Sequence, residues 1–378
     1  MRALVLREPG RPPEVEDLGI EDPRGGEVAV RVMASGVCRS DLHVADGDWA
    51  FPGPVVLGHE GAGVVEAVGP GVAEPGVGDP VALSWYWPCL ACADCQRGRP
   101  WACARTGAND HLQPDGTTRL RDASGGQVLA YLSVGTLAER AVVPAQAAIP
   151  LPAGVPWEVA ALIDCCVTTG VGAVLHAAGV APGEPVVVFG LGGVGLSVVM
   201  GAVLAGAHPL VAVDRVRAKL DLALELGATA AVEAGDDAET LARVREATGG
   251  GAAYAFEAAG LPRTAELAIQ AVRMGGTAVL VGLPAQGERA SFDVERTVEG
   301  SVSIVGANYG RSVPAVDFPR LARLYLAGRL PIDRLVEERI GLDAAPRALE
   351  ALRTGQGIRR VVVFEPGNPR APGTVVRS

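Results

Sequence analysis

Residues 186–195 read Val-Val-Val-Phe-Gly-Leu-Gly-Gly-Val-Gly. The apolar run 186–189 is typical of a buried parallel strand, and the glycines that follow it have the spacing G-x-G-x-x-G. Glycine at these positions permits a tight turn, close approach of a pyrophosphate, and close packing of a helix on the strand. The helix that follows would offer free main-chain N–H groups and its positive dipole end to that pyrophosphate. The stretch therefore predicts a dinucleotide-binding turn made by Gly190, Gly192, Gly193, Val194 and Gly195.

A second apolar run ends in Asp214, nineteen residues after Gly195. A carboxylate at the end of this second strand can accept hydrogen bonds from both ribose hydroxyls of NAD, and it would repel the 2′-phosphate of NADP. A glycine-rich turn alone occurs in many α/β proteins. Here the strand, turn, helix, second strand and acidic residue follow one another at the required spacing, so the sequence predicts NAD binding.

Strands and helices alternate around this stretch, from residue 167 to residue 304. The candidate strands are 186–189, 210–213, 229–232, 254–257, 277–282 and 302–305. Strands that alternate with helices in this way predict an α/β fold with a doubly wound parallel Rossmann sheet of about six strands. We expect helices between these strands, near 218–226 and 264–272, and a further helix near 318–327 in the last seventy residues of the chain.

The chain before residue 167 has a different pattern. Short Val-containing runs such as 27–32 and 63–68 are broken by Gly and Pro, which is typical of an irregular, mostly antiparallel β domain. A late strand at 360–364 would join the sheet of that domain. We therefore predict an NAD-binding Rossmann domain at 167–304, inserted in a second domain formed by residues 1–166 and 305–378.

Composition excludes several classes of protein. The chain has 378 residues, 49% hydrophobic and 20% charged, and this length and composition are typical of a globular protein with two domains. A net charge of −10 argues against nucleic-acid or anionic-membrane partners. We find no apolar run long enough to span a bilayer and no secretory pattern. Seven cysteines in so long a chain do not indicate a disulfide scaffold, so we expect a reducing, cytoplasmic location.

Four of these cysteines form a compact motif. They have the spacing C-x2-C-x2-C-x7-C, at Cys89, Cys92, Cys95 and Cys103. A closed tetrahedral zinc site needs four thiolates, which short loops of this kind can supply, although iron–sulfur clusters use related spacings. A closed site leaves no coordination position for a substrate, so we assign this cluster a structural role.

Three further candidate metal ligands are scattered along the chain. Cys38, His59 and Cys165 each lie in a glycine-containing motif. A single cysteine is often a small core residue, and a single histidine is often held by structural hydrogen bonds. Spacing alone therefore does not decide between a catalytic metal site and three core residues.

Several motifs together resemble a known family. Gly36-Val-Cys38-Arg-Ser-Asp41, Gly58-His59-Glu60, the four-cysteine loop, Cys165 and the glycine-rich turn are similar to those of the zinc-dependent medium-chain alcohol dehydrogenases. The segment 353–359 also fits, and 115–120 resembles the longer horse-liver and thiol-dependent formaldehyde dehydrogenase branches. The resemblance runs over nearly the whole chain. It implies a GroES-like, mostly β catalytic domain beside the Rossmann domain.

The resemblance implies two Zn²⁺ ions per chain. Cys38, His59 and Cys165 would bind a catalytic zinc with one open position, and the four-cysteine loop would bind a structural zinc. Two cysteines and one histidine are the ligands by which alcohol dehydrogenases are known to hold their catalytic zinc. Asp41 would orient the ring of His59, and Glu60 would lie behind the metal.

The same resemblance assigns a proton relay and cofactor contacts. Ser40 would hydrogen-bond the substrate oxygen, and His43 would pass the proton from the nicotinamide ribose hydroxyl to solvent. Arg39 and Arg359 would clamp the pyrophosphate. Lys219, the one lysine among 33 basic residues, would reach the adenosine ribose.

The substrate is predicted less directly. Trp49, Trp85 and Leu283 fall where family members line the substrate channel, which implies an apolar or aromatic alcohol or aldehyde. The glutathione-dependent branch has an arginine four residues after its last structural cysteine, where this chain has Gly107, and this difference argues against glutathione as a cosubstrate.

We therefore predict an NAD(H)-linked alcohol dehydrogenase, acting by direct hydride transfer, and a homodimer or homotetramer. The alternatives are a mycothiol-type formaldehyde dehydrogenase on the same scaffold and a catalytically silent, zinc-bound structural or binding protein.

Overall fold

The computed structural model describes residues 1–106, 111–355 and 357–364, and these form two compact units. Of the described residues, unit 1 contains those within Met1–Cys165 and Val313–Thr354, together with Arg359–Phe364. Unit 2 contains Cys166–Ser312 and Gly355–Ile358.

Unit 1 is built on two β-sheets whose strands are mostly antiparallel, as the broken Val-rich runs predicted. The first sheet has the order β2-β1-β5-β9-β8-β3, with bounds β1 Arg2–Leu6, β2 Glu14–Asp17, β3 Gly19–Ile20, β5 Val55–Val56, β8 Leu120–Arg121 and β9 Gln127–Ala130. The second has the order β11-β7-β6-β4-β19-β18, and β10 also pairs with β4; the bounds are β4 Glu27–Gly36, β6 Glu60–Val68, β7 Pro80–Leu83, β10 Arg140–Pro144, β11 Ala148–Pro150, β18 Val336–Ile340 and β19 Arg359–Val363.

Strand β4 organises the second sheet, because it pairs with β6, β10 and β19. The late strand β19 pairs antiparallel with β4, with Val361 opposite Gly36, so the prediction for 360–364 is confirmed. The helices of unit 1 are α1 Arg39–Asp46, α2 Ala93–Gln96, α3 Trp157–Leu162, α10 Pro314–Leu326 and α11 Ala345–Leu352. Helices α1 and α11 share one hydrophobic cluster, in which Leu42 and Val44 pack with Ala348 and Leu349.

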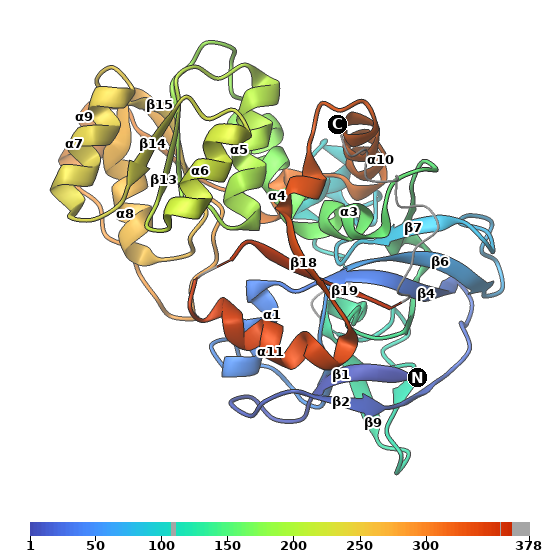
Figure 1. The fold of residues 1–378 in the computed structure, drawn as a ribbon. Coiled ribbons are helices and arrows are strands. Elements are labelled where there is room, and N and C mark those ends of the chain that lie inside the picture. Colours follow the sequence, from blue (N-terminus) through green and yellow to red (C-terminus); the bar gives the residue numbers. More distant parts are fainter. Residues whose placement is uncertain (107–110, 356, 365–378) are drawn as a thin grey trace, which may run out of the picture. The chain divides into compact units, whose positions relative to one another are not determined.

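Unit 2 is a doubly wound sheet of six parallel strands, as predicted. Its order is β14-β13-β12-β15-β16-β17, and the bounds are β12 Val186–Phe189, β13 Leu210–Asp214, β14 Ala230–Glu233, β15 Ala252–Glu257, β16 Val272–Leu280 and β17 Ser303–Gly306. Figure 1 shows α7, α8 and α9 on one side of these strands and α5 and α6 on the other. The helices are α4 Thr168–Gly172, α5 Gly193–Ala205, α6 Arg217–Glu225, α7 Asp237–Ala247, α8 Pro262–Ala271 and α9 Val294–Glu299.

Both faces of this sheet are covered, so its strands need apolar side chains on both sides. All four residues of β12 are buried. Val187 and Phe189 pack in one cluster with Leu241 of α7 and Leu267 of α8. Full burial of such side chains contributes about 1.5–3 kcal/mol each.

The boundaries of the units differ from the predicted domain boundaries. The second boundary lies between Ser312 and Val313, eight residues later than the predicted 304/305. Residues that follow β17 pack back onto α4: the Ser312 hydroxyl donates to the Thr168 carbonyl at 3.4 Å, and a Cβ added to Gly310 would lie 2.6 Å from that carbonyl oxygen. Unit 2 also includes Gly355–Ile358, a return of the chain that the sequence did not predict.

One helical run corrects the expectation that no segment is long enough to span a bilayer. Within the described residues, Trp157–Ala178 alone has the necessary length and apolar composition. Of its most apolar window, 83% is buried inside the protein. A helix that is apolar on all sides is also typical of a protein core, and its burial supports that interpretation.

Candidate functional site

Helix α1 carries several of the predicted residues, and Asp41 fixes its start. Asp41 is fully buried in the first turn. One carboxylate oxygen accepts the main-chain N–H of Cys38 at 3.1 Å, while the other accepts from the N–H of Gly58 at 2.9 Å and from Nδ1 of His59 at 3.2 Å. A single carboxylate therefore holds the start of α1 and the turn before β6 together, and it orients the ring of His59.

Four potential metal ligands converge in unit 1. One ligand atom each of Cys38, His59, Glu60 and Cys165 lies within 4.8 Å of the others. Since Nδ1 of His59 donates to Asp41, its Nε2 is left as the ligand nitrogen. Cys165 reaches the cluster from a π-helical turn, Ile163–Val167, a feature that is frequent at functional sites. Two thiols and an imidazole are a donor set that fits zinc.

The protonation of these groups is shifted by burial and mutual contact. Burial raises the pKa of Glu60 to about 8. Burial alone would lower the pKa of His59, but the Asp41 carboxylate and the Cys38 thiol outweigh it and raise that pKa. A hydrogen bond with Cys165 lowers the pKa of Cys38, and the same contact raises the pKa of Cys165. The contact between the two sulfurs therefore favours ionisation of Cys38 alone, whereas a bound divalent cation would favour ionisation of both cysteines.

Glu60 connects this cluster to Arg359. The two guanidinium nitrogens Nη1 and Nη2 lie 3.3 and 3.2 Å from its carboxylate oxygens, and Nη1 also donates to the carbonyl of Val37 at 3.1 Å. Arg359 is 6% exposed. The arginine predicted to clamp a pyrophosphate is therefore also the ion-pair partner of a candidate metal ligand, a contact that its spacing did not predict.

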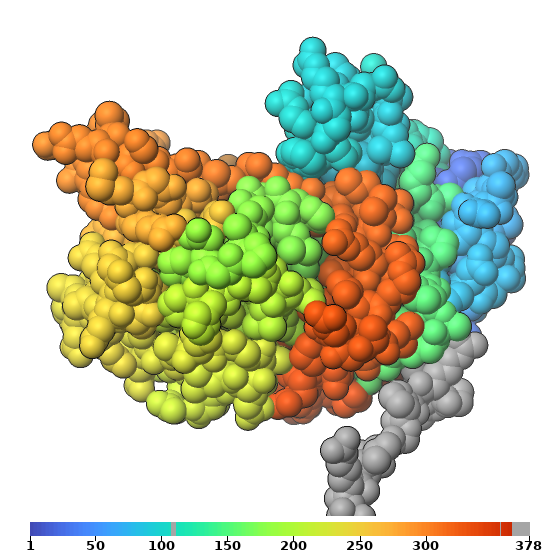
Figure 2. Space-filling model, turned by 90° about the horizontal axis from the view of Figure 1, so that it is seen from above, coloured from blue at the N-terminus to red at the C-terminus, as the bar shows by residue number. Residues whose placement is uncertain are grey.

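The four-cysteine loop forms a second cluster in unit 1. The sulfurs of Cys89, Cys92, Cys95 and Cys103 all lie within 4.8 Å of one another. The sulfur of Cys92 lies 3.5 Å from that of Cys95 and 3.9 Å from that of Cys103. In a tetrahedral site with Zn–S bonds of about 2.3 Å, neighbouring sulfurs would be roughly 3.8 Å apart, close to these distances. Figure 2 shows the segment around these cysteines, in cyan, standing out from the surface of its unit.

Main-chain N–H groups support thiolates in this loop. The N–H of Cys92 donates to the sulfur of Cys89, and the N–H of Cys89 donates to the sulfur of Cys103, both at 3.3 Å. A main-chain hydrogen bond from Cys95 lowers the pKa of Cys92 to about 6. The sulfur geometry and these donors fit a closed structural zinc site.

The two predicted relay residues lie on α1. Ser40 is half-buried in its first turn. His43 is 8% exposed, with Nδ1 2.7 Å from an oxygen of Asp48 and its ring stacked on Trp49. Sequence reasoning missed Asp48, for which the only available signal was its position directly after Gly47 at the end of a short helix.

An aromatic wall, made of Phe51, His111 and Tyr131, lies beside His59, and sequence reasoning missed it as well. Tyr131 meets the His59 ring edge-on with centroids 5.4 Å apart. Phe51 is 4.3 Å from His111 and 5.7 Å from Tyr131, measured between ring centroids. These residues are far apart in sequence and belong to no recognisable motif, so only the fold reveals the wall.

The glycine-rich turn of unit 2 has the tight backbone geometry that its glycine spacing predicts. Gly190 has φ +87°, and a Cβ on Gly195 would lie 1.8 Å from the Gly190 carbonyl oxygen, so neither position accepts a side chain. A Cβ at Gly192 would meet nothing within 4 Å. Helix α5 begins at Gly193 without a side-chain cap, which leaves its N–H groups available to a phosphate. Val194 lies in the first turn of this helix.

Asp214 is fixed beside this turn. Its two oxygens accept the main-chain N–H groups of Leu191 at 2.7 Å and Val216 at 2.9 Å. The carboxylate therefore stands in a single orientation at the end of β13, which fits recognition of a ribose.

The other predicted cofactor residues are placed as follows. Lys219 lies on α6, 8% exposed, and its Nζ donates to the carbonyl of Gly355 at 2.6 Å. Arg39 is exposed on α1, and its Nη1 donates to the carbonyl of Leu352 at 3.4 Å. Neither contact tests the predicted role toward the cofactor.

The predicted pocket residues do not share one cluster. Trp49 packs against the cluster that contains Leu42 and Tyr131, whereas Trp85 packs against the core of the second sheet of unit 1. Leu283 is 56% exposed in unit 2. Gly107 lies outside the described residues.

Comparison with protein families gives two matches. Residues 24–153 match the alcohol dehydrogenase GroES-like domain, and residues 193–327 match the zinc-binding dehydrogenase domain.

Individual relatives cover nearly the whole chain. An NDMA-dependent alcohol dehydrogenase of Amycolatopsis methanolica is 38% identical over 96% of this chain and 98% of its own length. A geraniol dehydrogenase of Castellaniella defragrans is 35% identical over 96% of this chain and 97% of its own. The crystal structure of benzyl alcohol dehydrogenase from Acinetobacter calcoaceticus superposes with a TM-score of 0.89, at 34% identity, over 96% of this chain and 99% of that one. The chain therefore belongs to the zinc-dependent medium-chain alcohol dehydrogenases, the family that its motifs predicted.

Proposed function

We propose that this alcohol dehydrogenase is a zinc-containing, NAD-dependent enzyme that interconverts apolar or aromatic alcohols with their aldehydes or ketones. The observation that carries the proposal is the convergence of Cys38, His59 and Cys165, with Asp41 holding the histidine ring. When bound, zinc supplies Lewis acidity and NAD supplies the hydride acceptor.

The residues of the chain divide the remaining work. Cys38, His59 and Cys165 would hold the catalytic metal, and Glu60 would stand as a fourth, exchangeable donor near the same position. Ser40 would accept the proton of the alcohol and His43 would take it onward. Gly190–Gly195, Asp214, Lys219, Arg39 and Arg359 would bind the dinucleotide.

The aromatic wall supports an apolar or aromatic substrate. Tyr131 contacts the ring of His59, and Phe51 contacts Tyr131 in turn. A substrate whose oxygen is at the metal would therefore have its carbon chain against aromatic surface. Two relatives have names that state substrates of this kind, benzyl alcohol and geraniol.

A specific observation favours a second electron acceptor. The relative from Amycolatopsis methanolica is named for its dependence on NDMA. We therefore include NDMA beside NAD as an acceptor in the test.

We also propose a cytoplasmic homo-oligomer with no nucleic-acid or membrane partner. None of the seven cysteines forms a disulfide, which suits a reducing compartment, and the net charge is −10. Strand β17 is an edge of the unit 2 sheet, and nearby Val294 and Val298 are 65% and 72% exposed. An apolar edge of this kind is suited to pairing with a second copy.

The test is a substrate and acceptor screen with the purified protein, combined with metal analysis. We expect two zinc ions per chain, and NADH formation with benzyl alcohol and geraniol at kcat/KM values roughly ten-fold or more above that for ethanol. Cys38→Ser serves as the inactive control. Turnover with NDMA but none with added NAD would overturn the proposal that NAD is the acceptor. No turnover with any alcohol or aldehyde would overturn the proposed function.

A further inference from the structure

The end of α1 builds a compact arrangement around His43. Gly47 ends the helix with φ 78° and turns the chain back, so that the next two side chains meet the imidazole. Asp48 Oδ2 lies 2.7 Å from Nδ1. Trp49 stacks on the ring with centroids 4.9 Å apart and an interplanar angle of 21°.

The two ring nitrogens therefore have different surroundings. An ionised carboxylate only accepts hydrogen bonds, so Nδ1 carries a hydrogen and donates it to Asp48. Nε2 is buried and makes no hydrogen bond to any residue in the described part of the chain. Buried polar atoms are rarely left without a hydrogen-bond partner, and a catalytic role is one of the reasons for which a protein keeps such an atom. A neutral ring protonated at Nδ1 presents a lone pair at Nε2, the form that accepts a proton.

We propose that Asp48 is a positioning residue for the proton relay: it holds His43 in the Nδ1–H tautomer, so that Nε2 is ready to accept the proton released from the alcohol. Asp48 then stabilises the imidazolium that forms, and the proton leaves to water. Water reaches this end of the pair, because the Asp48 side chain is 38% exposed whereas that of His43 is 10% exposed. The relay rests on the proposed function, whereas the tautomer depends only on the fold.

The tautomer can be measured without turnover. The chain has five histidines, so ¹⁵N-labelled histidine gives few signals, and the one missing from His43→Asn identifies His43. At a pH where the same spectra show the ring to be neutral, we expect the Nδ1–H tautomer in the unmodified protein. Asp48→Ala should shift it toward Nε2–H, while Asp48→Glu should retain it.

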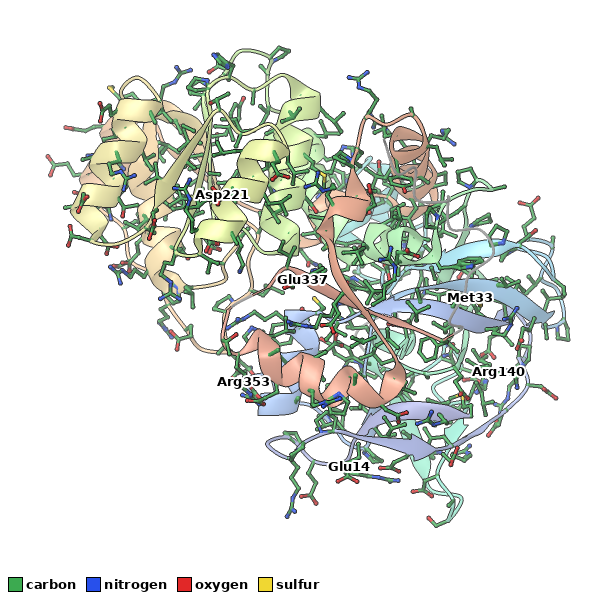
Figure 3. All side chains as sticks on the ribbon, in the orientation of Figure 1. Glu14, Met33, Arg140, Asp221, Glu337 and Arg353 are labelled. Atoms are coloured by element: carbon green, nitrogen blue, oxygen red, sulfur yellow. The ribbon has the colours of Figure 1, made fainter. Side chains whose placement is uncertain are left out.

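Asp46→Asn is the matched control. Asp46 lies two residues before Asp48, at the end of α1, and its carboxylate pairs with Arg353, labelled in Figure 3, rather than with His43. Like the Asp48 variants, it changes a carboxylate near the end of α1, but it should leave the His43 tautomer and the turnover rate unchanged.

Kinetics test the role of the tautomer. Asp48→Ala should lower kcat for alcohol oxidation roughly ten-fold, with a much smaller change in KM, because the base rather than substrate binding is affected. Asp48→Glu should recover most of the rate.

An Nε2–H tautomer in the unmodified protein, or no change in Asp48→Ala, would overturn the proposal. Unchanged kcat in Asp48→Ala, or an equal loss in Asp46→Asn, would overturn the role of Asp48 in the relay. If the unmodified protein oxidises no alcohol, the proposed function fails, and the tautomer measurement still decides the geometry.

Discussion

At the scale of single residues, we expect the choice of dinucleotide to depend on Asp214. Its carboxylate accepts hydrogen bonds from two main-chain N–H groups, which hold it in one orientation. Asp214→Gly removes the charge that repels a 2′-phosphate and the acceptor for the ribose hydroxyls. We expect NADH to bind at least ten-fold more weakly and NADPH to bind measurably, with Kd values from cofactor fluorescence as the measurement.

Asp214→Asn separates the effect of the negative charge from that of side-chain shape. The amide has nearly the same size, is neutral, and keeps one oxygen that can accept a main-chain N–H group. It should shift the preference in the same direction by a smaller factor. An unmodified enzyme that binds NADPH as tightly as NADH would show that Asp214 does not determine the choice.

His43 is the second residue whose role is open to a direct test. His43→Gln removes the proposed base at the end of the relay without changing the candidate metal ligands. We expect it to bind NAD and zinc normally and to oxidise alcohols roughly ten-fold or more slowly. Imidazole buffer should restore part of the rate, and rates measured against imidazole concentration check this. Wild-type rates without a buffer response would remove His43 from the mechanism.

At the scale of elements, the two groups of candidate metal ligands lie in different kinds of secondary structure. The four-cysteine cluster lies in a loop with few regular elements, in which α2 has only four residues. The other cluster draws its ligands from the start of α1, the start of β6 and the π-helical turn after α3. A metal would therefore stabilise the fold of the loop, whereas the second cluster is already held by hydrogen bonds and packing.

We accordingly expect Cys92→Ser to lower the melting temperature and Cys165→Ser to abolish turnover while leaving most of the stability. Each variant should lose about one zinc ion per chain. Thermal unfolding and zinc content, measured on both proteins, check this. An equal loss of melting temperature in both variants would contradict the assignment of one structural and one catalytic site.

At the scale of the whole molecule, the exposed edge of the parallel sheet predicts self-association. Val298→Glu places a charge on the exposed face of α9, where Val298 is 72% exposed, so it should leave the fold of the chain intact. We expect the unmodified protein to be a dimer or tetramer and this variant to dissociate at lower concentration, measured by light scattering after gel filtration. Val77→Glu, at a 64% exposed position in unit 1, is the control. Identical dissociation in both variants, or a monomeric unmodified protein, would contradict the prediction.

The sequence by itself determined the features that depend on local spacing. The glycine-rich turn, the four-cysteine loop and the alternation of strands and helices could be read from neighbouring residues, because each obeys a short-range rule of backbone geometry or metal coordination. All six predicted strands of unit 2 overlap observed strands. The family resemblance added Cys38, His59 and Cys165, whose separation in the chain exceeds any such rule.

Only the tertiary structure decided what depends on long-range contact. Arg359 meets Glu60 across 299 residues, the buried pair of Arg119 and Glu27 spans 92, and Tyr131 reaches the ring of His59 from a separate segment. Residues this far apart become neighbours only when burial of apolar surface folds the sheets, and no local pattern records the pairing. Asp48 lies only five residues from His43, yet its contact also required the structure, because it depends on the left-handed turn at Gly47 that returns the chain to the imidazole.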